Sequence, residues 1–171
     1  CKTSVGLYLF EDNYPYRGDF DFNDAVIQYE IKDYYQSKNR AKQITVQLMA
    51  TGSHMSNSFG FRDSKGFQPF LSGLKGYQNV YAAQAFEPIG EPVVQTLYGD
   101  VVPCLKNESE YYIYPSSFNT AEYPSVLDIP LSDPDDASWK FRWPQEMQSI
   151  DNCYWFLKSA SGGSREKDWY K

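Results

Sequence analysis

Six oxygen-bearing side chains are concentrated in one short acidic segment near the start of the chain. The segment covers residues 10–24 and lies between two apolar runs, and its oxygen-bearing residues are Glu11, Asp12, Asp19, Asp21, Asn23 and Asp24. Ca²⁺ takes roughly 6–8 oxygen ligands, and carboxylates this close would repel one another without a cation. We therefore predict a structural Ca²⁺ site, with Asp19, Asp21, Asn23 and Asp24 as main ligands, then Asp12 and finally Glu11. The alternative is a solvated acidic turn whose Asp and Asn side chains only cap the backbone.

The spacing of these residues matches the EF-hand calcium loop only in part. Counted from Asp19, the first, third and fifth positions carry oxygen, but the sixth is Asp24 where the EF-hand needs glycine. The final ligand would be Glu30, which lies in a β-branched and aromatic run over 25–31 that is typical of a strand. That strand would hold Glu30 roughly 16 Å from the loop, at ~3.3 Å per residue. The sequence therefore predicts a cation loop between strands, not a helix–loop–helix.

The same segment carries a family resemblance. Residues 7–12, 14–15 and 18–26 resemble the signature of LruC-type domains, which reads roughly F-E-D-x-x-P-x-x-G-D-x-D-x-N-D and then two hydrophobic residues. Residues 50–61 are similar to the small-residue segment of that family, with Ser58 in place of its usual glycine. Residues 155–170 are similar to its closing Trp, Gly and Asp-Trp-Tyr elements. The resemblance spans most of the chain, and its first motif is the specific one.

The resemblance implies a location and a metal loop but no reaction. LruC-type domains are β-rich and occur in exported cell-envelope proteins, commonly of Bacteroides-like bacteria, without an assigned activity. A protein of this kind would be outer-membrane-associated, periplasmic or displayed on the cell surface. We accordingly expect residues 1–171 to form a single LruC-type β-sandwich domain of a longer envelope protein. The sequence does not identify the partner, for which a surface glycan and another envelope protein are the two candidates.

Composition excludes several classes of protein. The hydrophobic share of 42% is that of a globular chain. The formal net charge of −6, without a basic patch, argues against nucleic-acid binding. No apolar run approaches the ~18 residues that a membrane-spanning helix needs. No signal peptide is present, so we expect that any such segment was removed or was never part of the sequence given.

The sequence offers little support for an enzyme. His54 is the only histidine, and no nucleophile-elbow or nucleotide-binding glycine motif occurs. The 22 acidic residues would always allow a glycosidase pair to be proposed, but the most clustered ones are better explained by a cation. Asp133, Asp135 and Asp136 suggest either a second, weak Ca²⁺ loop or, as we prefer, a solvated turn.

Aromatic residues supply a rival function. They make up 18% of the chain, with 15 Tyr, and exposed rings could stack on sugars. All four tryptophans lie in the last third of the chain: Trp139, Trp143, Trp155 and Trp169. A glycan-binding module is therefore the alternative, and burial of the aromatic residues in the core is the simpler reading of the same composition.

Three cysteines cannot all pair internally. Cys104 and Cys153 could form a disulfide in an oxidising compartment, or remain buried free thiols. Cys1 would suit a lipidated N-terminus, but the family motif follows it so closely that a boundary within a longer chain is the better expectation.

Short strands with frequent turn signals predict the fold. We expect strands over 4–10, 25–32, 43–50, 93–98, 111–114 and 126–129, with 25–32 and 43–50 forming a hairpin across a polar turn. Residues 51–76 read as short strands joined by tight turns, 79–85 as a strand or short helix, and 144–159 as the one helix. The prediction is an all-β, jelly-roll-like antiparallel β-sandwich with one short C-terminal helix. It would be a non-enzymatic, Ca²⁺-stabilised structural or adhesive module; glycan binding is the alternative, and a glycoside hydrolase is less favoured.

Overall fold

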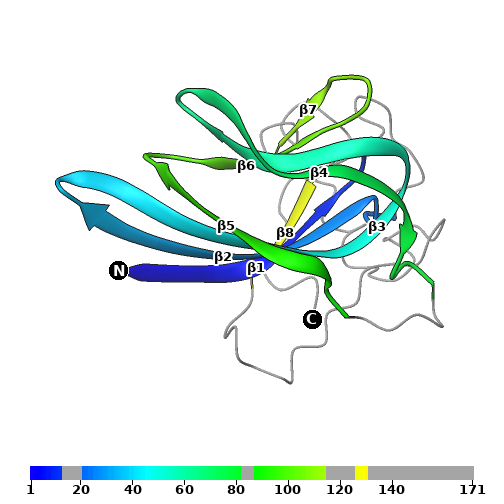
Figure 1. Ribbon diagram of the computed structural model, residues 1–171, viewed down its shortest axis with the longest axis horizontal. Helices are drawn as coiled ribbons and strands as arrows, with labels where there is room; N and C mark the ends of the chain where they lie inside the picture. The colour runs from blue at the N-terminus through cyan, green and yellow to red at the C-terminus, as the bar shows by residue number, and fades with distance from the viewer. Residues whose placement is uncertain (13–20, 82–86, 115–125, 131–171) are drawn as a thin grey trace, which may run out of the picture.

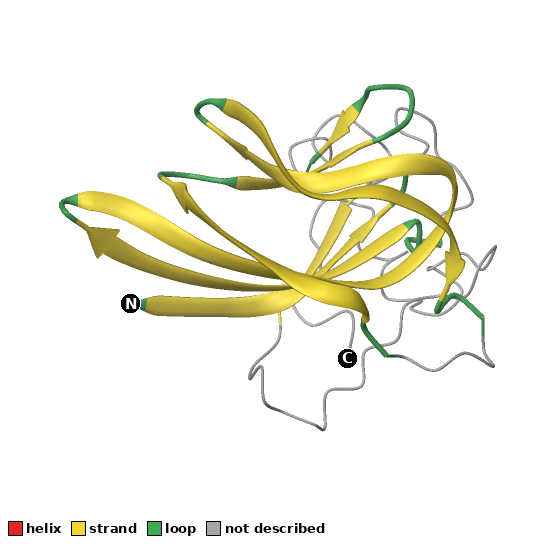
Figure 2. Cartoon of the chain, viewed as in Figure 1, coloured by secondary structure: helices red, strands yellow, loops and turns green. Residues whose placement is uncertain are grey.

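The computed structural model describes residues 1–12, 21–81, 87–114 and 126–130 of the chain (Figure 1). These residues form an antiparallel all-β fold without a helix, as Figure 2 shows. None of them therefore belongs to a helix that could cross a membrane. The strands are β1 (Lys2–Phe10), β2 (Ala25–Gln36), β3 (Asn39–Asp63), β4 (Gly66–Gln78), β5 (Ile89–Tyr98), β6 (Val102–Lys106), β7 (Tyr112–Ile113) and β8 (Val126–Pro130).

The long strand β3 determines how the sheet is built. Along one edge, its first half pairs with β2 and its second half pairs with β6. Along the other edge, its first half pairs with β5 and its second half with β4. The path of paired strands is β7-β6-β3-β2-β1-β8, and β4 and β5 branch from β3. The result is one curled antiparallel sheet (Figure 1).

Irregular pairing along β3 explains the curl. Val26 pairs with Ala50 but Ile27 pairs with Leu48, so Met49 is an extra residue in β3. Further shifts interrupt the β3–β4 register between Ser53 and Gly60. Such bulges bend a strand and increase its twist, so the second half of β3 turns back over β1.

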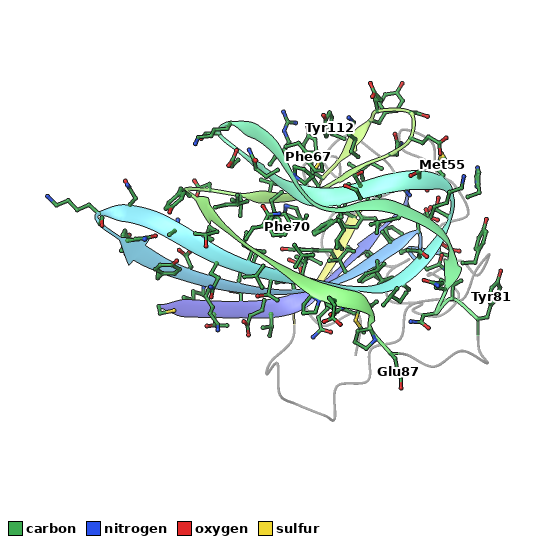
Figure 3. All side chains as sticks on the ribbon, viewed as in Figure 1. Met55, Phe67, Phe70, Tyr81, Glu87 and Tyr112 are labelled. Atoms are coloured by element: carbon green, nitrogen blue, oxygen red, sulfur yellow. The ribbon has the colours of Figure 1, made fainter. Side chains whose placement is uncertain are left out.

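The core fills the inside of this curl. The rings of Tyr8 and Phe10 on β1 lie 6.2 and 5.7 Å from that of Phe59, which comes from the far half of β3. Phe61 in turn contacts Phe70 of β4, which lies on the inner side of the sheet (Figure 3). A fully buried side chain of this size contributes roughly 1.5–3 kcal/mol. These aromatic contacts therefore hold the two halves of the curled sheet together.

Residues 5–10 of β1 are buried on both faces of the strand. Tyr8 and Phe10 point into the core, and Leu7 and Leu9 on the opposite face are also fully buried. Their neighbours on that face are buried as well: Val26, Leu127 and Ile129. The near-continuous hydrophobic run 5–10 is what a strand covered on both sides requires.

The six strands given separate limits and the hairpin are confirmed, with different bounds. Residues 79–81 form neither the strand nor the short helix expected over 79–85, and residues 82–85 lie outside the described residues. The 25–32 and 43–50 segments pair as expected, but the hairpin extends to Gln36 and Asn39. Its turn has only two residues, Ser37 and Lys38, both with positive φ (49° and 72°), as in a type I′ turn. The two predicted strands, which stopped at residue 32 and began at residue 43, were therefore too short.

Two other expectations need correction. Residues 51–76 are not several short strands; they continue β3 and form most of β4, joined by a turn at residues 64–65. The strand β6 was not predicted. The antiparallel all-β class is confirmed, whereas the two-sheet sandwich remains a prediction. The predicted helix over 144–159 lies outside the described residues, as do the Asp133–Asp136 turn and all four tryptophans.

Candidate metal centre

The acidic segment closes one end of the core. Glu11 and Asp12 follow the last residue of β1, and residues 21–24 lead into β2, whose first residue pairs with Phe10. All five described candidates are at most 5% exposed: Glu11, Asp12, Asp21, Asn23 and Asp24. The alternative prediction, an acidic turn exposed to solvent, is therefore wrong for these five residues. The sixth candidate, Asp19, lies outside the described residues.

Three of the carboxylates accept backbone hydrogen bonds. Asp24 Oδ2 accepts from the N–H of Asp12 at 2.7 Å, and Glu11 Oε1 accepts from the N–H of Phe22 at 2.6 Å. Asp21 Oδ1 accepts from the N–H of Asn23 at 3.3 Å, forming a turn around Phe22. Phe22 has a φ of 55°, which is unusual for a non-glycine residue, and its ring is fully buried. The carboxylates thus fix the conformation of the segment.

Asp12 connects three parts of the sheet. Its Oδ2 accepts hydrogen bonds from Ser53 Oγ and from Asn57 Nδ2, the latter at 2.9 Å, both in β3. Its carbonyl accepts from Asn107 Nδ2 at 2.8 Å, in the turn between β6 and β7. Asn107 Oδ1 also accepts from the N–H of Tyr111 at 2.9 Å. The end of β1 is therefore tied to both the bend of β3 and the β6–β7 turn.

Sequence reasoning missed these three polar partners. Ser53 and Asn57 lie in the small-residue segment over 50–61 that entered the family resemblance, which was the one available signal. Asn107 lies in an ordinary polar turn and carries no such signal. Residues from distant strands become partners only through the curl of β3, which the sequence pattern did not predict.

The electrostatic environment of Asp24 favours a neutral or cation-bound carboxyl group. Burial raises the pKa of Asp24 well above its usual value, and the nearby charges of Glu11, Asp12 and Asp21 raise it further. The hydrogen bond from the Asp12 N–H acts in the opposite direction but is outweighed. The donors in the bonds described above are backbone N–H groups, a hydroxyl and amides, all of which are uncharged.

The donor chemistry suits a hard cation, but the present arrangement is not a finished coordination shell. The available atoms are carboxylate and amide oxygens, the ligands that Ca²⁺ prefers. Asn57 Oδ1 and Thr51 Oγ1 are buried without a hydrogen-bond partner in the described part of the chain. Within that same part, no three acidic, histidine or cysteine side chains are grouped closely enough to hold a metal. The Ca²⁺ site therefore remains a prediction.

The other candidate residues lie elsewhere. His54 is exposed on β3. Cys104 is a fully buried free thiol in β6, and Cys1 is an exposed free thiol. The disulfide between Cys104 and Cys153 is thus not supported, although Cys153 itself lies outside the described residues.

Comparison with known proteins adds no relative. No family model matches the chain, and neither a curated protein nor a solved structure matches it. The LruC-type resemblance consequently stays a prediction from the motif.

Proposed function

We propose that this chain is a non-enzymatic, Ca²⁺-stabilised structural or adhesive module. The cation would bind in the acidic segment, held by Asp12, Asp21, Asn23 and Asp24, with Glu11 and Asp19 completing the predicted set. Bound there, Ca²⁺ would supply the positive charge that the cluster needs and hold the start of β2 to the end of β1. The proposed cell-envelope location depends on the LruC-type resemblance alone.

The observation that carries the proposal is the burial of four carboxyl groups in one cluster. Glu11, Asp12, Asp21 and Asp24 are each at most 5% exposed, and the other three act on Asp24 as like charges. Burying an ionised carboxylate is costly unless a counter-charge compensates it. Asp12 is also hydrogen-bonded to β3 and to the β6–β7 turn. A cation that neutralises the carboxylates here would therefore stabilise the whole end of the core.

A thermal melt in Ca²⁺ and in EGTA tests the proposal directly. For the wild type, Ca²⁺ at a hundredfold its Kd should add about 2.7 kcal/mol. For a domain of this size, that corresponds to a rise in Tm of roughly 5–11 °C. The informative variant is Asp24→Asn, whose amide oxygen can still accept the Asp12 N–H bond but carries no charge.

The variant should separate cation binding from simple charge repulsion. In EGTA, Asp24→Asn should melt at or above the wild type, because a buried like charge is gone. In Ca²⁺, the variant should lose most of the rise in Tm that Ca²⁺ gives the wild type. The control variant is Glu91→Gln, which removes one charge at an exposed position of β5. It should keep the full Ca²⁺-dependent rise in Tm. Equal melting of the wild type in Ca²⁺ and EGTA, with no metal found by elemental analysis, would refute the proposal.

A further inference from the structure

An aromatic and cationic surface lies on the outer face of the second half of the curled sheet. Phe61, Leu105 and Ile113 point into the core, so the alternate residues beside them point outward. In the β-sheet register, Arg62 is opposite Phe67 on one side and Val102 on the other, and Lys106 is opposite Tyr112. We refer to the following residues as the outer aromatic surface: Arg62, Phe67, Lys106, Tyr112 and Tyr114.

Close ring contacts organise this surface. The guanidinium carbon of Arg62 lies 5.6 Å from the ring centroid of Tyr112 and 5.5 Å from that of Tyr114. Phe67 from β4 meets the ring of Tyr112 edge-on at 5.6 Å, although the two strands are at opposite edges of this part of the sheet (Figure 3). The small residues Gly60 and Cys104 lie between them in the register. The rings of Tyr112 and Tyr114 therefore flank the Arg62 guanidinium, and Phe67 meets Tyr112 across the sheet.

The donors of Arg62 remain available. None of the hydrogen bonds or ion pairs of the described residues uses its guanidinium, whereas Arg40 is bonded to Asp33 and Asp100. Lys106 Nζ lies 5.7 Å from the Tyr112 ring and pairs at 3.7 Å with Glu110, whose side chain is 80% exposed. An exposed pair of this kind contributes little. The surface thus presents a planar cation and a second cation beside aromatic rings, on a chain of net charge −6.

We propose that the outer aromatic surface binds a uronic acid unit of an acidic polysaccharide. The apolar face of the sugar ring would stack on Tyr112 and Tyr114, and its carboxylate would take the bidentate fork of Arg62. An acidic peptide fits less well, because extended peptides bind to sheet edges through main-chain hydrogen bonds and this surface is a sheet face. A single-stranded nucleic acid needs a run of cations along its phosphates, and two are present here.

Titration of the full chain with a hyaluronan hexasaccharide tests this assignment. Chitohexaose is the neutral match, because it shares the N-acetylglucosamine units and lacks carboxylates. Hyaluronan should bind, chitohexaose should bind at least tenfold more weakly, and a glutamate hexapeptide should not compete. The titration is run in Ca²⁺ and in EGTA below the melting transition. Binding that is equal in both conditions separates this surface from the cation site, so either proposal can fail alone.

Three variants give the decisive comparison. Arg62→Gln should weaken hyaluronan binding about tenfold or more, which is the discrimination expected for one charge-assisted contact. Tyr112→Ala should also weaken it, because the ring on which the sugar stacks is lost. Lys75→Gln removes the same charge at an exposed position of β4 outside this surface and should bind as the wild type does. Melting curves establish that each variant is folded. Absent wild-type binding, unchanged binding of Arg62→Gln, or equal binding of the glutamate peptide would each overturn the assignment.

Discussion

The hydroxyl group of Tyr29 occupies the space that a side chain on Gly6 would need. The two residues are directly opposite in the β1–β2 register, and a Cβ placed on Gly6 would lie 2.5 Å from Tyr29 Oη and 2.6 Å from the carbonyl oxygen of Ile129. The hydroxyl continues past Gly6 to donate a 2.8 Å hydrogen bond to Asp128 on β8. Gly6 thus allows a side chain of β2 to cross β1 and fasten the edge strand.

Replacing Gly6 with alanine should therefore destabilise the protein. Overpacking of this kind costs about 1–3 kcal/mol, and the contact with the Ile129 carbonyl cannot be relieved by a side-chain rotation. Tyr29→Phe should lose about 1.5–3 kcal/mol, the range for a hydrogen bond to a charged group. Urea denaturation of both variants measures these losses.

The double variant shows whether the two residues act together. Removing the Tyr29 hydroxyl relieves part of the clash, so Gly6→Ala with Tyr29→Phe should lose less than the sum of the single losses. Additive losses would mean that the two residues contribute independently to stability, which would contradict the close approach of Tyr29 Oη to Gly6.

The pH dependence of stability should reveal the raised pKa of Asp24. In EGTA, the folded protein retains a proton on Asp24 above pH ~3.9, where the unfolded chain has released it. Stability from this group is therefore greatest at low pH and falls as pH rises toward the folded pKa. Ca²⁺ replaces the proton, so the increment in Tm between Ca²⁺ and EGTA should grow from pH 4 to pH 7.

Other groups titrate at the acid end of this range, so the comparison needs Asp24→Asn at each pH. Asp33 has a lowered pKa because Arg40 and Lys42 donate hydrogen bonds to it, and its contribution is lost as pH falls, which is the opposite sign. Both proteins contain Asp33, so subtracting the variant's curve of Tm against pH from that of the wild type cancels the contribution of Asp33. The contribution of Asp24 remains. A difference that stays constant from pH 4 to pH 7 would contradict the raised pKa.

The sequence predicted the strands more completely than it predicted their arrangement. Period-two alternation at Ile44, Val46 and Leu48 locates a half-buried strand, because that pattern depends on neighbouring residues alone. The continuation of β3 through Gly52 and Ser53 was missed because small residues there resemble a turn. Bulges instead preserve the strand and bend it.

The candidate site was predicted to a similar degree. The acidic residues are adjacent in the sequence, so their type and spacing identified five buried members of the cluster. Ser53, Asn57 and Asn107 were not identified, since they meet Asp12 only after β3 has curled and β6 has paired with it. Long-range polar partners of this kind leave no local pattern.

Cys104 should be chemically inert in the folded protein. Burial raises the pKa of its thiol to about 11, and the thiolate is the form that reacts with alkylating agents. At pH 8, iodoacetamide should modify the exposed Cys1 promptly and Cys104 only in urea, as followed by peptide mass spectrometry. Modification of Cys104 at the rate of Cys1 in native conditions would show that the β6 region opens readily.

Asn107 provides the last test, because it joins the acidic cluster to the β6–β7 turn. Asn107→Ala removes the donor to the Asp12 carbonyl and the acceptor of the Tyr111 N–H, and two such bonds contribute about 1–3 kcal/mol together. Hydrogen exchange should accelerate at the Tyr111 amide and across residues 107–113, with urea denaturation measuring the loss in stability.

Asn107→Asp separates the two bonds. Its carboxylate can still accept from the Tyr111 N–H but has no donor for Asp12, so Tyr111 should stay protected from exchange. The added charge also lies beside a cluster that is already acidic, so this variant should lose more stability in EGTA than in Ca²⁺. Equal losses in the two conditions, with Tyr111 still protected from exchange, would mean that Asn107 acts only within its own turn and does not connect it to the cluster.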